Sequence, residues 1–206
     1  ALHSFNLEIA GGTFVTLLGP SGCGKSTALN CLAGLLDLSE GEILLNDKPI
    51  QFVPAEKRGF GMVFQNYALF PHLTVLRNVS YGLEIRGVAR AERARRVQRA
   101  LELVHLEQFG KRFPAQLSGG QQQRVGIARA LAVSPPVLLM DEPFGALDTV
   151  TRSSITEDFR NLDERKSQTI VLVTHDVSEA FALADTICLM DAGRISDMLR
   201  ERPCRG

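Results

Sequence analysis

The hydrophobic positions of the chain form short apolar runs that alternate with stretches of helical spacing. The short runs are rich in branched residues and predict buried strands at 14–18, 59–64, 137–140, 169–174 and 186–190. The stretches between them predict helices at 25–35, 91–104, 120–131, 153–162 and 177–184. Strands that alternate with helices indicate βαβ units and therefore a mostly parallel sheet.

Two segments depart from this alternation. Near the start of the chain, Phe5, Leu7 and Ile9 alternate with polar residues, which predicts a half-buried antiparallel strand. From about Val75 to Ala132 the pattern is helical almost throughout. The predicted fold class is therefore α/β, with an antiparallel β part at the N-terminus and an α-helical insert in the core.

Composition narrows the classes of function without choosing one. The 206 residues balance 23 Lys plus Arg against 23 Asp plus Glu, so no excess positive charge favours a general nucleic-acid binder. Cys23, Cys31, Cys188 and Cys204 show no CxxC pair and no metal-ligand spacing, so we expect reduced thiols. No apolar run approaches the roughly 18 residues that a membrane span requires, so we expect any membrane role to come through a partner.

The segment after the first predicted strand fits the phosphate-loop pattern G-x-x-x-x-G-K-[ST], and it stands between a strand and a helix as that pattern requires. Its glycines let several backbone N–H groups point at phosphate oxygens, and the helix N-terminus adds partial positive charge. We expect Lys25 to reach the β and γ phosphates and Ser26 to place its hydroxyl on Mg²⁺. The predicted nucleotide-binding residues of this loop are Gly19, Pro20, Ser21, Gly22, Cys23, Gly24, Lys25, Ser26 and Thr27.

A second candidate site lies where the predicted strand 137–140 ends in two acidic residues followed by Pro143. Neighbouring side chains on an extended backbone point in opposite directions, so Asp141 and Glu142 can have different roles. We expect Asp141 to hold Mg²⁺ through water and Glu142 to face the water that attacks the γ-phosphate. A solvated turn would explain an acidic pair alone, but this pair ends a core strand, where open α/β sheets bind ligands.

A third candidate site opens the predicted helix 120–131. Ser118 is a favourable N-cap residue, whereas Gly119 and Gly120 weaken the helix start by about 1 kcal/mol each relative to alanine. That local cost is understandable if bare N–H groups must approach an anion closely. Gln121 completes the sequence Leu-Ser-Gly-Gly-Gln, and the chain thus has two predicted phosphate-binding helix starts that are far apart in sequence.

Together these motifs resemble the ATP-binding subunit of an ABC transporter. The phosphate loop, Leu-Ser-Gly-Gly-Gln and Leu-Leu-Met-Asp-Glu-Pro occur in the order of that family, and Gln65, Asp148 and His175 complete the set. The resemblance covers nearly the whole chain. It implies a P-loop NTPase (RecA-like) core at 1–74 and 133–206 and a helical subdomain at 75–132. It also implies an enzyme that hydrolyses ATP with Mg²⁺.

The resemblance assigns roles to single residues as well. Gln65 would sense the γ-phosphate and Mg²⁺ and would link them to the helical insert. His175 would form hydrogen bonds with the γ-phosphate and the attacking water. The implied catalytic residues are Glu142, His175, Gln65 and Lys25, and the implied metal-binding residues are Ser26, Gln65 and Asp141.

The resemblance further implies partners. Two ATPase subunits would pair head to tail, so that the segment 118–120 of one closes over the ATP that Lys25 of the other holds, and Asp148 would connect the two sites. The other partners would be transmembrane permease subunits and, indirectly, a solute-binding protein. These partners would place the chain at the cytoplasmic face of the cell membrane, and no nucleic acid is expected among them.

Three stretches point to two different branches of the family. The segment 61–75 resembles bacterial importer ATPases for polyamines, ferric iron and sugars, whereas 140–152 and 179–185 resemble the osmoprotectant importers. In the first stretch, Leu69, Phe70 and Leu73 form an apolar patch that the resemblance assigns to docking of the membrane subunit, with core packing as the alternative. Because other subunits select the substrate in this family, this chain does not determine which solute is carried.

The remaining expectations concern the ends of the chain and the competing functions. The adenine-stacking aromatic of the family would lie upstream of Ala1 and the usual regulatory β-domain does not follow, so we expect truncation at both ends. The leading hypothesis is a motor ATPase that drives solute uptake. A soluble ABC-type ATPase acting on ribosomes or DNA is the alternative, and the neutral charge disfavours it. A regulatory subunit without hydrolysis is disfavoured by the presence of Lys25, Glu142 and His175.

Overall fold

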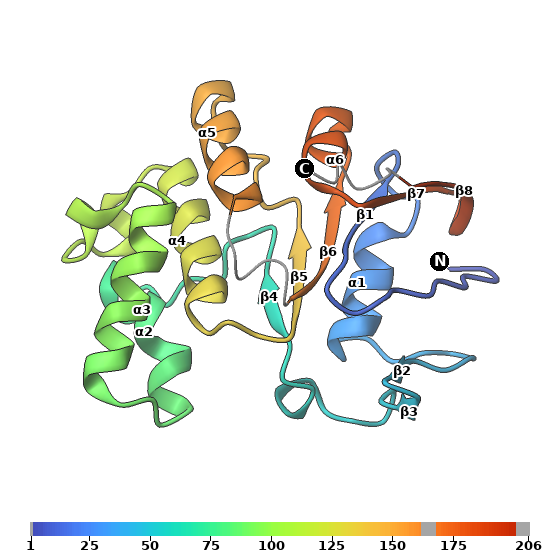
Figure 1. The fold of residues 1–206 in the computed structure, drawn as a ribbon, viewed down its shortest axis with the longest axis horizontal. Coiled ribbons are helices and arrows are strands. Elements are labelled where there is room, and N and C mark those ends of the chain that lie inside the picture. The colour runs from blue at the N-terminus through green and yellow to red at the C-terminus, as the bar shows by residue number, and fades with distance from the viewer. Residues whose placement is uncertain (1, 162–167, 201–206) are drawn as a thin grey trace. The chain divides into compact units, whose positions relative to one another are not determined.

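Residues 2–161 and 168–200 are described by a computed structural model, in which the chain divides into two units (Figure 1). The first unit comprises Ala1–Met62, Pro136–Asp141 and Lys166–Gly206. The second comprises Val63–Pro135 and Glu142–Arg165. The predicted helical subdomain, 75–132, lies entirely within the second unit.

The main sheet has the strand order β4-β5-β6-β1-β7-β8. Its strands are β1 (Phe14–Leu18), β4 (Gly61–Val63), β5 (Val137–Asp141), β6 (Thr169–Thr174), β7 (Thr186–Asp191) and β8 (Arg194–Arg200). β1 pairs in parallel with β6 and β7, and β5 pairs in parallel with β6, whereas β7 and β8 are antiparallel. The predicted, mostly parallel sheet is therefore confirmed, and its strands coincide with the predicted apolar runs except at β8.

Burial explains why these runs become strands. All five residues of β1 are buried, and β6 is buried from its second residue on, as expected for parallel strands covered on both faces. The helices of this unit are α1 (Lys25–Ala33) and α6 (Val177–Leu183). Leu29 of α1 packs with Leu17, Leu139 and Val173 in one hydrophobic cluster. Separate from the main sheet, β2 (Leu44–Leu45) and β3 (Lys48–Pro49) form a small antiparallel pair, and Ala55–Lys57 form a short 3₁₀ turn.

The register of the sheet determines where its functional edge lies. Leu18 at the end of β1 is opposite Thr174 at the end of β6, and Asp141 at the end of β5 is opposite Val173. The carboxyl ends of these three parallel strands therefore meet at the same edge. Open α/β sheets bind ligands at such an edge.

The second unit is helical. Its helices are α2 (Val75–Ile85), α3 (Arg90–Leu103), α4 (Gly119–Ala132) and α5 (Thr149–Arg160), with 3₁₀ turns at Glu107–Phe109 and Pro114–Gln116. Val79, Leu83 and Leu101 of the first two helices are buried together with Val125 and Ile127 of α4. The predicted helical stretch is thus confirmed. The predicted helix 153–162 begins earlier than expected, at Thr149, and its last predicted residue lies outside the described residues.

The N-terminal segment corrects one prediction. Phe5, Leu7 and Ile9 are half-buried and pack against the hydrophobic cluster of the first unit, and the residues between them are exposed. Nevertheless, residues 2–10 form no strand in the described structure. Alternation fixes which side chains face the core, but a strand also requires a neighbouring edge for its ladder of hydrogen bonds. The antiparallel pairs of this fold are instead β2–β3 and β7–β8.

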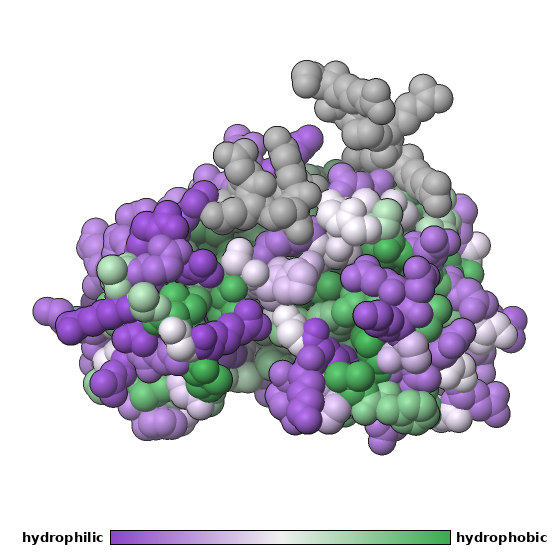
Figure 2. Space-filling model, turned by 60° about the horizontal axis from the view of Figure 1, so that its bottom comes forward, coloured by the Kyte–Doolittle hydropathy of each residue, from purple (hydrophilic) through white to green (hydrophobic). Residues whose placement is uncertain are grey.

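The cysteines and the surface agree with a globular chain that has no disulfide among its described residues. Cys23, Cys31 and Cys188 are free and buried, and burial raises the pKa of the Cys188 thiol to about 11; Cys204 lies outside the described residues. On the face shown in Figure 2, hydrophilic side chains surround smaller hydrophobic patches. Among the described residues, no helix combines the length and the apolar character needed to cross a membrane.

Candidate functional site: a phosphate loop and a glycine-rich helix start

The loop between β1 and α1 has the backbone conformation that its glycines predict. Gly22 and Gly24 have φ values of 82° and 103°, in the left-handed region that residues with a Cβ rarely adopt. Gly19 is required for a different reason, because a Cβ there would collide with the backbone carbonyl oxygen of Met190 at β7. The loop is thus shaped by backbone turns at its centre and by close packing at its start.

The start of α1 leaves backbone donors available for an anion. Its N-cap is Gly24, which has no side chain to cap the helix. The N–H groups of Lys25, Ser26 and Thr27 have no acceptor within the described part of the chain, and Ala28 is the first to donate inside the helix, to Gly24 at 2.9 Å. Unpaired N–H groups together with the positive end of the helix dipole form a site suited to phosphate.

Lys25 closes this loop. Its side chain is only 5% exposed, and its Nζ donates to the carbonyl oxygens of Gly19 and Pro20, each at 2.8 Å. An ammonium group has three donors, so two of them hold the loop in shape. The third points toward Cys23 Sγ at 3.8 Å, which is a weak acceptor. The lysine charge is therefore fixed at the loop, where a phosphate oxygen would meet it.

Two predicted metal-binding residues, from motifs more than a hundred positions apart, meet at the sheet edge. Ser26 Oγ donates to Asp141 Oδ1 at 3.0 Å, and Asp141 is 7% exposed. Hydroxyl and carboxylate oxygens are the ligands that Mg²⁺ prefers. Groups of three or more His, Cys, Asp or Glu that could hold a metal ion are absent from residues 2–161 and 168–200.

His175 lies at the same edge, directly after β6, and is exposed. The turn that carries it is fixed by hydrogen bonds on both sides. Thr174 Oγ1 donates to Glu179 Oε2 at 2.6 Å and accepts from the Asp176 N–H at 3.0 Å. The Asp176 carboxylate caps α6 by accepting from the N–H groups of Ser178 and Glu179. The contribution of Thr174 was not predicted, because nothing in the local sequence shows that its hydroxyl meets Glu179.

In the second unit, α4 begins with a reciprocal cap. Ser118 Oγ accepts from the Gln121 N–H at 3.3 Å, and Gln121 Oε1 accepts from the Ser118 N–H at 3.0 Å. The N–H groups of Gly119 and Gly120 have no acceptor within the described residues. A Cβ at Gly120 would lie 3.0 Å from the Ala146 carbonyl oxygen. Glycine therefore permits this close packing, and the helix start keeps two open backbone donors.

The residues after β5 correct the reasoning about the acidic pair. β5 ends at Asp141, and Glu142 has a φ of 45°, so the backbone is not extended through both acids. The left-handed turn at Glu142, rather than strand alternation, sets the direction of its side chain. Further along, Asp148 caps α5 by accepting from the Thr151 N–H at 3.0 Å, and this hydrogen bond lowers the pKa of the Asp148 carboxyl.

Gln65 is exposed and lies two residues after β4, before a strained segment. Tyr67 and Ala68 have φ values of 63° and 44°, and their carbonyl oxygens accept from the Arg129 guanidinium at 3.0 and 2.7 Å. A Cβ at Gly126 of α4 would lie in ordinary van der Waals contact with the Tyr67 backbone, so α4 packs against this segment. Arg129 thus stabilises the segment, and no local pattern predicted this role.

The patch predicted to dock a membrane subunit is half-buried. Leu69, Phe70 and Leu73 are each partly exposed. The ring centroids of Phe70 and Tyr81 lie 4.4 Å apart. The Arg129 guanidinium lies 5.5 Å from the centroid of the Phe70 ring. Core packing therefore accounts for part of this apolar surface, and the rest of it faces outward.

With this geometry described, comparison with known proteins identifies the family. Residues 2–145 match the family described as ABC transporter. The chain belongs to this family. Membership in the ABC transporter family explains the order of the phosphate loop, the Ser118 helix start and the acidic strand end along the chain, and it confirms the predicted ATP-binding fold class.

Relatives in the ABC transporter family share about half of their residues with this chain. It is 51% identical over 198 residues to the spermidine/putrescine import ATP-binding protein PotA of Oleidesulfovibrio alaskensis, covering 96% of this chain and 53% of the relative. It is 50% identical to the sulfate/thiosulfate import ATP-binding protein CysA of Synechocystis sp., covering 96% and 56%. The Fe(3+) ions import ATP-binding protein FbpC of Brucella abortus is 50% identical, with 95% and 56% covered. The chain thus spans about half the length of these relatives.

Solved structures in the family share the fold. A dimeric post-hydrolysis structure of the ATP-binding cassette MJ0796, bound to ADP and Pi, superimposes with a TM-score of 0.89 at 37% identity, and covers 98% of this chain and 90% of that one. A second dimeric structure of MJ0796, described as a bacterial ABC transporter cassette, gives the same TM-score at 38% identity. The predicted α/β fold class is confirmed by these similarities.

Proposed function

We propose that this chain hydrolyses ATP as the motor subunit of an ABC importer and that hydrolysis drives solute uptake through partner membrane subunits. One observation carries the proposal: Lys25, Ser26 and Asp141 are assembled at one sheet edge, beside open backbone N–H groups. The names of the relatives, which are import ATP-binding proteins for spermidine/putrescine, sulfate/thiosulfate and Fe(3+) ions, support the importer class. We further propose that 1–74 and 133–206 form the ATP-binding core and 75–132 the helical subdomain.

In this proposal the loop 19–27 holds the phosphates. The N–H groups of Lys25, Ser26 and Thr27 donate to phosphate oxygens, and the Lys25 ammonium neutralises the charge of the β and γ phosphates. Ser26, Asp141 and Gln65 would hold Mg²⁺. When bound, Mg²⁺ would neutralise phosphate charge.

The reaction itself requires a base and a group that fixes the γ-phosphate. Glu142 accepts a proton from the attacking water, and His175 forms a hydrogen bond with the γ-phosphate. Because Thr174 and Asp176 fix the turn on either side of His175, the backbone that carries the imidazole has a defined position. The bond that breaks is the one between the γ-phosphorus and its bridging oxygen, and the products are ADP and inorganic phosphate.

We propose that two copies pair head to tail, as the dimeric MJ0796 cassettes support. Gly119 and Gly120 of one copy would donate their open N–H groups to the ATP of the other, with Ser118 and Gln121 shaping the helix start. Asp148 would link the two sites. Leu69, Phe70 and Leu73 would dock a permease subunit, so that the chain works at the cytoplasmic face of the membrane.

Glu142→Gln tests the catalytic part of this proposal. The amide cannot accept a proton, so turnover should fall by roughly 10²–10⁴-fold while ATP binding is retained. Phosphate release and equilibrium ATP titration measure the two quantities, and size-exclusion chromatography with ATP should show accumulated dimers. Glu157→Gln, an exposed change on α5, is the matched control. Unchanged hydrolysis in Glu142→Gln would refute the assignment of the base.

Mixed dimers test the pairing. Lys25→Ala and Ser118→Arg damage opposite halves of a shared site, so a mixed dimer contains one intact site and one site with both changes. Mixing the two inactive variants should therefore restore turnover, with a dependence on protein concentration. Turnover that is independent of protein concentration in the unmodified protein would contradict the head-to-tail pairing.

A further inference from the structure

The segment after β5 carries backbone strain at the residue proposed as the general base. Glu142 has a φ of 45°, which non-glycine residues rarely adopt. The next residue is Pro143, and a residue before proline favours extended backbone. Strain of this kind persists only where the surrounding structure holds it, and it often accompanies a functional residue. A neighbouring group must therefore hold Glu142 in this conformation.

Gln123 of α4 is in the position to do so. It is 2% exposed, and its amide contacts the segment at both ends. Its Nε2 donates to the Glu142 carbonyl oxygen at 3.1 Å, and its Oε1 accepts from the Ala146 N–H at 2.9 Å. The Gly145 N–H also donates to the Glu142 carbonyl, at 3.3 Å, so the turn closes on itself around the same oxygen.

The packing around this bridge leaves the amide little freedom. Phe144, which lies between the two bonded residues, is fully buried, and Leu147, directly after them, is nearly so. These two side chains anchor the segment. On the helix side, Gly120 lies one turn before Gln123 and brings α4 close to the Ala146 carbonyl. Both the amide nitrogen and the amide oxygen of Gln123 thus form hydrogen bonds with the 142–146 segment. A side chain that only filled a core position would not need these two bonds.

We propose that Gln123 is a positioning residue for the proposed base: its two hydrogen bonds hold Glu142 in the left-handed conformation that aims the carboxylate. This inference rests on the proposed function. Without the Gln123 donor, Glu142 relaxes toward the extended backbone favoured before proline, and its carboxylate moves away from the attacking water. The effect falls on the reaction step and not on nucleotide binding, because the phosphate loop belongs to the other unit.

Two substitutions in the full chain separate positioning from packing. Gln123→Glu keeps the size of the side chain and can still accept from Ala146, but its carboxylate no longer donates to the Glu142 carbonyl. Gln123→Met keeps approximate volume and removes both hydrogen bonds. Gln122→Glu makes the same chemical change one residue earlier, where the amide donates to Pro114 and Leu117 instead.

We expect kcat for ATP hydrolysis to fall by roughly 10- to 100-fold in both Gln123 variants, because small displacements of a reacting group have effects of that size. KM for ATP should stay close to that of the unmodified protein. The unfolding midpoint should fall modestly in both variants, because Gln123→Glu places a carboxylate at a buried position and Gln123→Met leaves two backbone groups without their partner. Amide hydrogen exchange at Ala146 should accelerate in Gln123→Met and remain protected in Gln123→Glu. Gln122→Glu should retain the unmodified kcat. If Gln123→Met does not fold, Gln123→Glu still decides the matter.

The two possible failures are distinguishable. If the unmodified protein shows no ATP hydrolysis that depends on Glu142, the proposed function itself is refuted. If that hydrolysis is present and Gln123→Glu leaves kcat unchanged, the positioning role is refuted and the proposed function stands. If kcat falls only in proportion to the fraction of protein that is unfolded at the assay temperature, Gln123 is structural, which also overturns the inference.

Discussion

Both α1 and α4 begin on glycine-rich sequence, but α1 begins after Gly24, which cannot cap it, and α4 begins after Ser118, which does. At α1 the first-turn N–H groups stay open, and a buried lysine lies beside them. At α4 the reciprocal cap gives the N–H groups of Ser118 and Gln121 an acceptor. The N–H groups of Gly119 and Gly120, which lie between them, have no acceptor among the described residues. The first start is therefore suited to bind an anion alone, and the second to complete a site built elsewhere.

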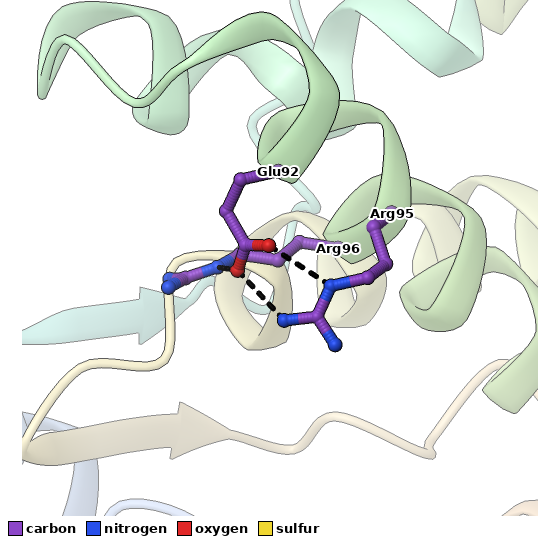
Figure 3. Close-up of polar contacts among 3 residues, drawn as sticks. All are labelled: Glu92, Arg95 and Arg96. Carbon is purple, nitrogen blue, oxygen red and sulfur yellow. Dashed lines mark hydrogen bonds and ion pairs between the residues drawn. The ribbon is translucent and has the colours of Figure 1, made fainter.

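The same contrast extends to charged groups in the two units. In the first unit Lys25 is held at a loop that has open donors, so its charge is available to a ligand. In the second unit Glu92 of α3 binds Arg95 and Arg96 through three hydrogen bonds of 2.7–2.9 Å (Figure 3). The helical unit thus satisfies part of its charge internally, which favours a solvated surface for α3 over a lipid-binding one.

The largest effect should come from Lys25→Ala. Removing a buried, hydrogen-bonded charge from a site typically costs about 2–5 kcal/mol of binding free energy, on the order of 30- to 5000-fold in Kd. Titration with a fluorescent ATP analogue would measure it, with the exposed Lys48→Ala as control. Ser118→Arg should leave the affinity of the unpaired chain unchanged. A comparable loss in Ser118→Arg would break the distinction between the two helix starts.

Alanine substitutions at Gly22 and Gly120 should show that glycine is present at the two helix starts for different structural reasons. Gly22→Ala places a Cβ in the left-handed region, at a cost of about 1–2 kcal/mol of unfolding free energy, although the surrounding space is open. Gly120→Ala gains about 1 kcal/mol of helix propensity but meets Ala146 at 3.0 Å, so the net change should be small. Denaturant unfolding measures both, and an equal cost at both sites would contradict this reasoning.

Much of this comparison could be predicted from the sequence, because local patterns determine local structure. The apolar runs predicted β1, β5, β6 and β7, and the phosphate-loop pattern predicted the turn and the helix that follow β1. Ser118 was recognised as a cap because capping depends on a few neighbouring residues. Ser26 and Asp141 were each assigned to Mg²⁺ from their own motifs, but the direct hydrogen bond between them was not predicted.

Most of the features that were missed depend on contacts distant in sequence. Gln123 meets Ala146, and Arg129 meets Tyr67, only after the chain has folded, and no local pattern reports such pairs. Thr174 and Glu179 are only five residues apart, but their contact depends on the turn between β6 and α6. The conformation of Glu142 was missed because the apolar run before it predicts where a strand begins better than where it ends. The alternation at Phe5, Leu7 and Ile9 predicted burial correctly but could not supply a partner strand.

Ser118→Ala should have a moderate effect on stability. It removes the side-chain acceptor for the Gln121 N–H and half of the reciprocal cap, for a loss of about 1 kcal/mol of unfolding free energy. Ser118→Asp, which keeps an acceptor, should retain most of the stability. Thermal or urea unfolding followed by circular dichroism measures the difference. A Ser118→Ala protein as stable as the unmodified one would show that the glycines, and not the cap, define the start of α4.

The smallest effect should appear at Glu92 in acid. Hydrogen bonds from Arg95 and then Arg96 lower the pKa of the Glu92 carboxyl to about 2, whereas an unfolded glutamate titrates near 4.3. A depressed folded-state pKa contributes stability that is present above pH ~4.3 and is lost as the pH falls toward about 2. Glu92→Gln should therefore be slightly less stable than the unmodified protein at pH 7 and equally stable near pH 2. Because the carboxylate is exposed, 0.5 M salt should reduce the difference at pH 7. Urea unfolding at several pH values measures this difference in stability, with the exposed Glu107→Gln as control. A difference that persists unchanged near pH 2 would show that packing of the Glu92 side chain, and not its charge, is responsible.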